Sequence, residues 1–465
     1  MDSLKYSDAL MGLVNGILKK IQFQHNNAEL SLLDNETVND DGETEWQTFL
    51  HHCIECIAKA AETNPLQVFN LVLEVWQESV SAYAMGSVSL YQLKDLAALT
   101  QLLGRLMPTL FHECDETMGK QCLSQADRFL ESLLVVLQRV SATDHRLLQM
   151  QPQPMFDAFM RVHADVLACV GGVIPYVSQG SFQPGALLRA ASPLLLTLSP
   201  PIAPVLSHAA AHLLLSVAVS LRVSDPLQHL NDLVSRPLTH LEAKTAAVIR
   251  QALCVMVLQC PGDGIQTPER VRQCSVLVEA WCAPLMGLSG GGTLPQVGQA
   301  CAQSLPQLGQ LLDYFADHNT QTKKMLATAV ERPVQAALMA FQNSNGDGEI
   351  STLVLELFLS LLGSLHQQLG NDFVQQSIRM FMDVAKRQEQ GALQRLLQVL
   401  RLCVEGGALP GEAALTELLQ LCMTHVLPVV HGADADPDVT YSLFQLLGSI
   451  LINRWQYFYS SCVRL

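Results

Sequence analysis

Apolar residues recur along this chain at the spacing of an α-helix, every third or fourth position. The pattern is clear in residues 10–21, 129–137 and 353–365. No run alternates apolar and polar residues convincingly, and no Asn-Gly pair joins two such runs, so strands and hairpins are not predicted. The sequence therefore predicts an all-α fold.

Turn-forming residues interrupt this pattern at intervals of about 20 residues, the length of one helix and one turn. Two such helices give a repeat of about 40 residues, which is typical of HEAT or armadillo arrays. The absence of a strict consensus favours HEAT repeats, so we predict a HEAT-repeat superhelical solenoid over residues 1–465. A single compact helical domain is the alternative, and it would need longer crossing loops. Interruptions that carry this argument include residues 64–65, 107–108, 151–152, 199–200, 260–261 and 436–437.

Composition narrows the classes of protein further. Apolar residues make up 49% of the 465 residues and charged residues 15%, which excludes a largely disordered chain. The net charge of −15 repels phosphate, so we expect protein partners with basic surfaces and no nucleic acid. The 13 cysteines form no short-spaced disulfide framework, which indicates a reducing compartment and mostly buried thiols.

Residues 190–221 contain no Asp, Glu, Lys or Arg and are long enough to span a bilayer. Four prolines break the first half, at 193, 200, 201 and 204, and serines and histidines interrupt the second half. A buried helix after a Pro-rich turn explains this run better than a transmembrane helix does, so no membrane insertion is predicted.

Six acidic residues lie within twelve positions, in a stretch without Lys or Arg. We expect an exposed loop near residues 30–45, between a helix ending near Phe23 and one beginning near Glu43. Such a loop is either a solvated linker or a contact for a basic partner, and its acids are the candidate protein-binding residues. A second connector, Gly-rich, is expected at 287–293. The six acids are Asp34, Glu36, Asp40, Asp41, Glu43 and Glu45.

Three patterns imitate metal sites. Residues 343–354 resemble a calcium loop, but the twelfth position is Val354 instead of the required Glu, so we expect a turn that caps the helix beginning near Ile350. Cys53 and Cys56 have zinc-like spacing without a second ligand pair, and two buried thiols are the simpler interpretation.

His208 and His212 share a helix face, but no Glu follows the first of them, which favours core histidines. No nucleophile elbow, phosphate loop, dinucleotide fingerprint or kinase motif is present. We therefore predict no catalytic residues, no metal, no cofactor and no enzyme.

Three blocks of the sequence resemble the importin-β (karyopherin) family of nuclear transport receptors, in the order that the family's exportins show. The first two lie near the start and past the middle of the chain, and the third precedes its end. Between about 65 and 345 the resemblance is one of helix pattern alone. The blocks include Lys5–Leu10, Ile21–Gln24, Leu33–Thr37 and Glu45–Gln47, then Phe358–Leu365 and Asp372–Phe373, then Pro437–Val439 and Asn453–Phe458.

The resemblance implies a HEAT superhelix and the role of an export receptor that shuttles between nucleus and cytoplasm. Family exportins bind protein cargo together with the GTPase Ran in its GTP form, and cross the pore through nucleoporin Phe-Gly repeats. One family exportin that the blocks resemble carries actin with profilin. Its N-terminal Ran-binding repeats precede the first matched block and are expected to be absent here. A HEAT-repeat scaffold or adaptor without transport function is the alternative.

The end of the chain is less polar than a capping repeat should be. Ile450, Leu451, Trp455, Tyr457 and Phe458 are expected on a final helix whose apolar face lacks a following repeat. We expect that helix to fray or the chain to self-associate.

Overall fold

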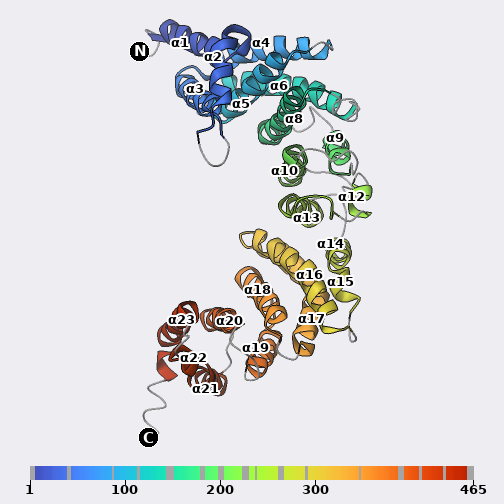
Figure 1. Ribbon diagram of the computed structural model, residues 1–465, viewed down its shortest axis with the longest axis vertical. Helices are drawn as coiled ribbons and strands as arrows, with labels where there is room; N and C mark the ends of the chain where they lie inside the picture. The colour runs from blue at the N-terminus through green and yellow to red at the C-terminus, as the bar shows by residue number, and fades with distance from the viewer. Residues whose placement is uncertain are drawn as a thin grey trace. The chain divides into compact units, whose positions relative to one another are not determined.

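The computed structural model describes the chain except for residues 1–5, 39–42, 86–87, 113–115, 143–150, 178–183, 197–203, 222–229, 236–237, 260–266, 289–291, 345–346, 386–391, 408–410, 433–435 and 458–465. The described residues are almost entirely helical, and their extended pairing is limited to one isolated bridge between Thr37 and Thr44. The all-α prediction is confirmed, and the helices follow one another along each unit (Figure 1).

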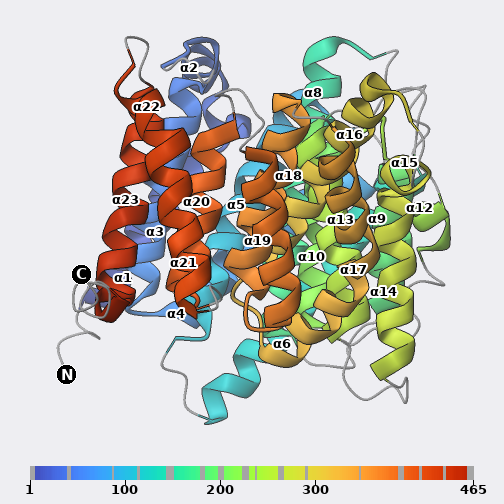
Figure 2. The same cartoon turned by 90° about the horizontal axis from the view of Figure 1, so that it is seen from below.

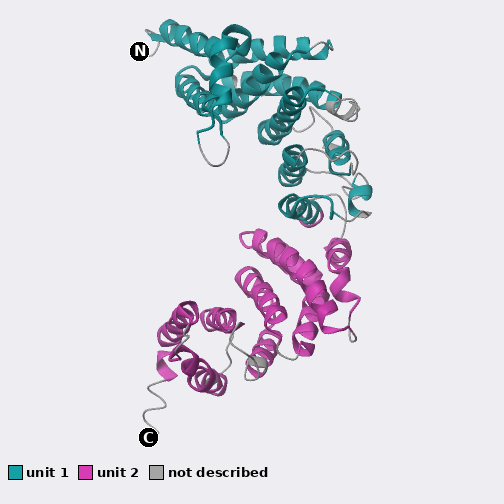
Figure 3. Ribbon diagram, in the orientation of Figure 1, with its two compact units in different colours: residues 1–256 teal, residues 257–465 magenta. Residues whose placement is uncertain are grey.

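The chain divides into two compact units, residues 1–256 and 257–465 (Figure 3). The helices of the first unit, the last of which crosses the boundary, are α1 (Ser7–Lys20), α2 (Phe23–Asn35), α3 (Glu45–Ala61), α4 (Pro65–Ala84), α5 (Leu90–Leu110), α6 (Glu116–Ala142), α8 (Gln153–Val173), a 3₁₀ turn (Ile174–Tyr176), α9 (Pro184–Leu196), α10 (Pro204–Ser220), α12 (Asn231–Ser235) and α13 (Ala243–Gln259).

The helices of the second unit are α14 (Thr267–Trp281), α15 (Ala283–Met286), α16 (Leu294–Tyr314), α17 (Thr320–Asn343), α18 (Gly348–Leu365), α19 (Asn371–Ala385), α20 (Leu393–Glu405), α21 (Gly411–Leu421), α22 (Leu427–Val430) and α23 (Pro437–Asn453). A π-helical segment, Cys422–Val426, joins α21 to α22.

Packing runs between helices that are close in the sequence. In the first unit α5 packs on α3, α4 and α8, and α8 packs on α10. In the second unit α14 packs on α17, α16 on α18, and α20 on both α18 and α23. Helices α20 and α23 run alongside one another in Figure 2. Stacking on near neighbours is what a helical solenoid requires, because each repeat buries its apolar face against the next.

Large aromatic side chains form the centre of each unit. Trp76 is fully buried, packs edge-on against Phe129 at 5.1 Å, and donates its indole N–H to Thr100 Oγ1 at 2.9 Å. In the second unit Phe381 packs edge-on against Phe341 and Phe358, at 5.0 and 4.8 Å. Because the buried indole N–H has a hydrogen-bond partner, burying it does not carry the free-energy cost of an unsatisfied donor.

Helix starts follow the local sequence in several places. Ser89 forms a capping box with Gln92 at the start of α5, and Asn319 accepts from the Thr322 amide at the start of α17. Asp347 accepts from the amides of Glu349 and Ile350, both at 3.0 Å. The predicted capping of the next helix by an Asp side chain is confirmed, whereas residues 345–346 of the predicted turn lie outside the described residues.

The expected final helix is shorter than predicted. It ends at Asn453, while Trp455 and Tyr457 lie in a further turn and Phe458 is outside the described residues. Ile450 is fully buried, so it does not belong to the exposed face. Leu451 and Trp455 are exposed, at 56% and 54%, as expected.

Candidate protein-binding surface

The acidic segment forms a short hairpin between α2 and α3. The Val38 amide donates to the Glu43 carbonyl, and the Glu45 amide to the Glu36 carbonyl, both at 2.8 Å. The Thr37–Thr44 bridge lies between these bonds. The segment is therefore a paired stem, where the sequence predicted an exposed loop. Asp40 and Asp41, which the sequence placed in that loop, lie outside the described residues.

Thr44 joins this stem to α3. Its hydroxyl accepts from the Gln47 amide at 3.2 Å, and the Gln47 side chain accepts from the Thr44 amide at 3.0 Å. This capping box satisfies amides that a helix start leaves without partners inside the helix. The hairpin stem thus leads directly into a well-defined helix start.

Asp34 does not belong to the exposed acidic set, which corrects the sequence prediction. It lies in the last turn of α2, half-buried, and its carboxylate accepts from Lys94 Nζ of α5 at 2.6 Å. The same carboxylate accepts from the Thr44 hydroxyl at 3.2 Å, while Lys94 lies over the Phe23 ring at 4.6 Å. Asp34 therefore ties α2, α5 and the hairpin together.

Glu36, Glu43 and Glu45 are all exposed on the hairpin stem. Glu45 is the first residue of α3, where a negative charge is favourable because the helix dipole places partial positive charge at that end. These three acids are the part of the predicted site that the structure leaves accessible on the stem.

The helix that was predicted to end near Phe23 is α1, which ends at Lys20, but a further helix, α2, begins at Phe23 where the sequence predicted a loop. Gln22 is at the N-cap position of α2 and makes no side-chain cap hydrogen bond. Asp95 of α5 supplies the cap from 72 residues away, accepting from the amides of Phe23 and Gln24 at 2.5 and 3.0 Å. Sequence reasoning missed Asp95, although an acid among the leucines of a predicted helix was a visible signal.

Burial dominates the electrostatics of Asp95, which is only 4% exposed. It raises the pKa of the carboxyl to about 6, against the opposing effects of the two backbone amides and of His25. The carboxylate is ionised at neutral pH but titrates well above an ordinary aspartate.

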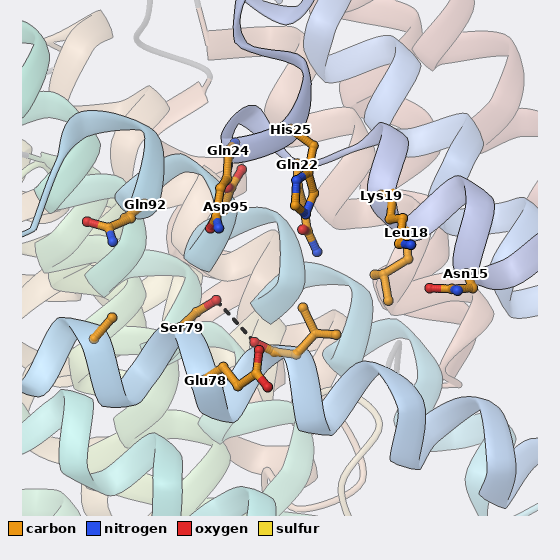
Figure 4. A pocket seen from close by; sticks show the side chains of 12 residues that line it. Asn15, Leu18, Lys19, Gln22, Gln24, His25, Glu78, Ser79, Gln92 and Asp95 are labelled. Atoms are coloured by element: carbon orange, nitrogen blue, oxygen red, sulfur yellow. Dashed lines mark hydrogen bonds between the residues drawn. The ribbon is translucent and has the colours of Figure 1, made fainter.

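A cavity of about 390 Å³ opens beside Asp95, between the corner of α1 and α2 and the helices α4 and α5 (Figure 4). Its polar lining mixes amides with two carboxylates, one ammonium group, an imidazole and a hydroxyl, all of which can donate or accept hydrogen bonds. Among the described residues no group of three potential metal ligands occurs. The lining consists of Asn15, Leu18, Lys19, Gln22, Gln24, His25, Val75, Glu78, Ser79, Ala82, Gln92 and Asp95.

The two cysteines with zinc-like spacing are not both buried, which corrects the prediction for them. Cys53 is half-buried and Cys56 is exposed on α3, whereas the other eight described cysteines are buried, as predicted. Burial, and to a smaller extent the neighbouring Cys56, raise the pKa of Cys53 to about 11. At neutral pH the Cys53 thiol is therefore protonated and a weak nucleophile.

The histidine pair on α10 is also more accessible than predicted. The Nε2 atoms of His208 and His212 are 3.1 Å apart, and His208 Nδ1 lies 3.3 Å from the Thr245 hydroxyl. His212 is exposed, so the two residues are not core histidines. Partial burial and the neighbouring His208 lower the pKa of His212.

Three helical stretches in the described parts of the chain are long and apolar enough to cross a bilayer by length and composition alone. They are Gln153–Tyr176, Gly348–Leu365 and Ala413–Val430, of which 67%, 56% and 28% respectively is buried. The charge-free run at 190–221 is divided between α9 and α10, which are shorter apolar helices. More than half of each of the first two stretches is buried and belongs to the hydrophobic core between packed helices.

Comparison with known proteins gives a consistent result across nearly the whole chain. The chain is 24% identical to Exportin-6 of Homo sapiens and 26% identical to Exportin-6 of Danio rerio, in each case over 99% of its residues. It is 20% identical to Exportin-6 of Dictyostelium discoideum over 97%. The similarity supports homology to exportin-6.

The alignments cover 46%, 45% and 47% of those relatives, so the chain spans about half the length of the curated relatives that it matches. No family model matches the chain. An engineered protein of known structure overlaps 91% of the chain with a TM-score of 0.27 and 11% identity, too low to carry an argument.

Proposed function

We propose that this chain, a homologue of exportin-6, acts as a segment of a nuclear export receptor. The observation that carries the proposal is the alignment with exportin-6, which extends over 99% of the chain. Stacked helices of the solenoid type offer extended surfaces for large protein partners, which fits a carrier of folded cargo. The chain would act by binding and not by catalysis.

The finer proposal is that the cargo is actin with profilin, bound together with Ran in its GTP form. The receptor would shuttle between nucleus and cytoplasm and contact nucleoporin Phe-Gly repeats on the way. Cargo and Ran would be coupled by linkage, since each would favour the same conformation of the helical array. These expectations come from the resemblance of the sequence blocks to the export receptors.

The acidic hairpin is the proposed contact for a basic face of a partner. Glu36, Glu43 and Glu45 project from a stem whose position is fixed by backbone pairing and by Asp34. Asp40 and Asp41 would add to the same charge. Clustered charges on a fixed element speed the encounter with an oppositely charged surface more than they tighten the final complex.

Retention of profilin–actin on immobilised protein, with and without Ran bound to a non-hydrolysable GTP analogue, tests the proposed function. The chain and a chimera with the N-terminal repeats of human exportin-6 should be compared. Ran-GTP should raise retention of profilin–actin by the chimera several-fold. A partner retained equally well with and without nucleotide-loaded Ran would instead support a HEAT-repeat scaffold.

The role of the hairpin is tested by the triple change Glu36→Gln, Glu43→Gln and Glu45→Gln. It should slow association several-fold and flatten its dependence on salt, with far-UV circular dichroism unchanged. The matched control is Glu74→Gln, Glu131→Gln and Asp317→Asn, three exposed acids elsewhere with the same change in net charge. Equal association rates for the two triple variants would return the hairpin to the interpretation of a solvated linker.

A further inference from the structure

Helix α10, in the interior of the first unit, carries two histidines on one face. Residues four positions apart lie one helical turn apart, and His208 and His212 are the only two of the 14 histidines in the chain with a spacing of three or four. Their rings meet edge to face, with centroids 4.5 Å apart and ring planes at 70°. This arrangement brings the two Nε2 atoms to within 3.1 Å of each other.

The separation of these two nitrogens is close to that of two imidazole ligands on one metal ion. Zinc binds imidazole nitrogens at about 2.0–2.1 Å and prefers tetrahedral angles, so two such nitrogens on one ion lie about 3.3–3.4 Å apart. The Nε2 atoms of the pair, at 3.1 Å, differ from this by only a few tenths of an ångström. Small rotations of the two rings remove the difference without any movement of the α10 backbone.

The hydroxyl of Thr245, on α13, orients the first of the two rings. His208 Nδ1 lies 3.3 Å from Thr245 Oγ1, and Thr245 is fully buried. When the Nδ1–H donates to this hydroxyl, His208 Nε2 carries the lone pair that a metal ion needs. Histidines that bind metals almost always donate their other ring N–H to a fixed acceptor, which sets both the tautomer and the ring direction.

The second ring is neutral at neutral pH and accessible from solvent. His212 is exposed, and partial burial together with the neighbouring His208 lowers its pKa. Protons therefore compete only weakly with a metal ion for this ring. In the metal-free pair the His212 Nε2–H donates to His208 Nε2, and on metal binding this hydrogen moves to Nδ1 of the same His212 ring, so no net proton is released.

We propose that His208 and His212 bind one zinc ion through their Nε2 atoms, with water in the remaining coordination positions. No group of three potential metal ligands occurs in the described part of the chain, so the protein supplies two ligands. The site is therefore weaker and exchanges more readily than a structural zinc site with four protein ligands. The inference goes beyond the proposed receptor function, because neither cargo nor Ran takes part in it.

A helix is a favourable frame for two ligands. The backbone of α10 holds both rings at a fixed separation, so the second imidazole binds at little further cost in conformational entropy. Helix α10 is itself held by its packing on α8 and α9 (Figure 1). A histidine without a neighbour at this spacing offers one ligand only and should bind zinc much more weakly.

Competition for zinc between the whole chain and a coloured chelator of moderate affinity tests the proposal. The comparison is made in a Cys56→Ser background, because an exposed thiol also binds zinc. His212→Gln should lose one equivalent of bound zinc, or bind it at least tenfold more weakly, with unchanged circular dichroism. The control is His431→Gln, an exposed histidine of the second unit with no histidine four positions away, and it should bind zinc as the parent does. A parent chain that takes up no zinc would overturn the proposal, as would equal uptake by His212→Gln.

The orienting hydrogen bond is tested separately at Thr245. Thr245→Val removes the hydroxyl with little change in side-chain volume and should weaken zinc binding about tenfold, since loss of such an outer hydrogen bond commonly has an effect of this size. Thr245→Ser keeps the hydroxyl and should restore the affinity of the parent. Loss of packing alone would not follow this order, because serine fills the buried position less well than valine. Equal zinc affinity for Thr245→Val and the parent would overturn the orienting role of the hydroxyl.

Discussion

The acidic hairpin of the first unit and an exposed face at α23 in the second unit present opposite chemistry to solvent. We call the second surface the α23 stripe, defined as Tyr441, Phe444, Leu451, Ile452 and Trp455. The hairpin presents carboxylates on a stem that is tied down by Asp34, Lys94 and a capping box. The stripe presents aromatic and aliphatic side chains with no charge at its centre. Fixed charges act at a distance and mainly change how fast a partner arrives, whereas apolar area acts on contact and mainly changes how slowly it leaves.

The two surfaces also differ in their effect on the stability of the folded protein. The three exposed acids of the hairpin remain hydrated, so they have little effect on stability in the free protein. The stripe leaves apolar area exposed to water, which costs free energy roughly in proportion to that area. The two surfaces should therefore respond differently to mutation, to pH and to protein concentration.

The largest effect should separate the two faces of α23. Ile450→Ala should lower the free energy of unfolding of the second unit by about 2–5 kcal/mol, because Ile450 is fully buried. Leu451→Ala, at the adjacent exposed position, should change it by no more than about 0.5 kcal/mol. Denaturant unfolding followed by hydrogen exchange of residues 437–453 provides the measurement. Similar losses for both variants would show that the stripe is packed in the free chain.

The next effect concerns Asp95, the buried aspartate of α5 that caps the start of α2. Its pKa is about 6 in the folded protein, against 3.8 for a freely hydrated aspartate side chain, so the folded state holds this proton more tightly than the unfolded state. Ionisation of Asp95 therefore opposes folding: stability is greatest below about pH 4 for this group and falls as the pH rises through 6. A shift of this size corresponds to about 3 kcal/mol.

Asp95→Asn should remove that contribution to the pH dependence while it keeps an acceptor for the α2 amides. The difference in unfolding free energy between the wild type and this variant, measured from pH 4 to pH 7.5, isolates Asp95 from other titrating groups. The matched variant Asp313→Asn, an exposed aspartate on another helix, should leave the pH profile unchanged. A wild-type profile that does not fall relative to Asp95→Asn would contradict the pKa assignment.

The sequence predicted what depends on short-range pattern and missed what depends on distant partners. Helical periodicity and the Asp347 cap both follow from neighbouring residues, and both are confirmed. Helix α2 was missed because its cap comes from Asp95, on a helix that begins 67 residues after Phe23. No local signal near Phe23 reports that contact, and only the acid on the buried face of α5 could have suggested it.

The candidate site was predicted in part for the same reason. Clustered acids on the surface follow from composition, and Glu36, Glu43 and Glu45 are exposed as expected. The sequence could not separate Asp34 from them, because its partner Lys94 is 60 residues away. The α23 stripe was foreseen through Leu451 and Trp455, whereas Ile450 points to the core because it is offset from the stripe by about half a helical turn.

The smallest effect tests whether Asp34 belongs to the fold or to the charged surface. Asp34→Asn removes a half-buried ion pair with Lys94 that also involves the Thr44 hydroxyl, so it should lower the free energy of unfolding of the first unit by about 1 kcal/mol. Glu62→Gln, which removes the mostly exposed pair with Lys59, should have almost no effect.

Asp34→Asn should also leave the association rate with a basic partner nearly unchanged, since its charge is already compensated by Lys94. Chemical denaturation and stopped-flow binding of the two variants provide the comparison. If Asp34→Asn slowed association as much as the change of one exposed hairpin glutamate, Asp34 would be part of the binding surface. It would then have to be grouped with Glu36, Glu43 and Glu45.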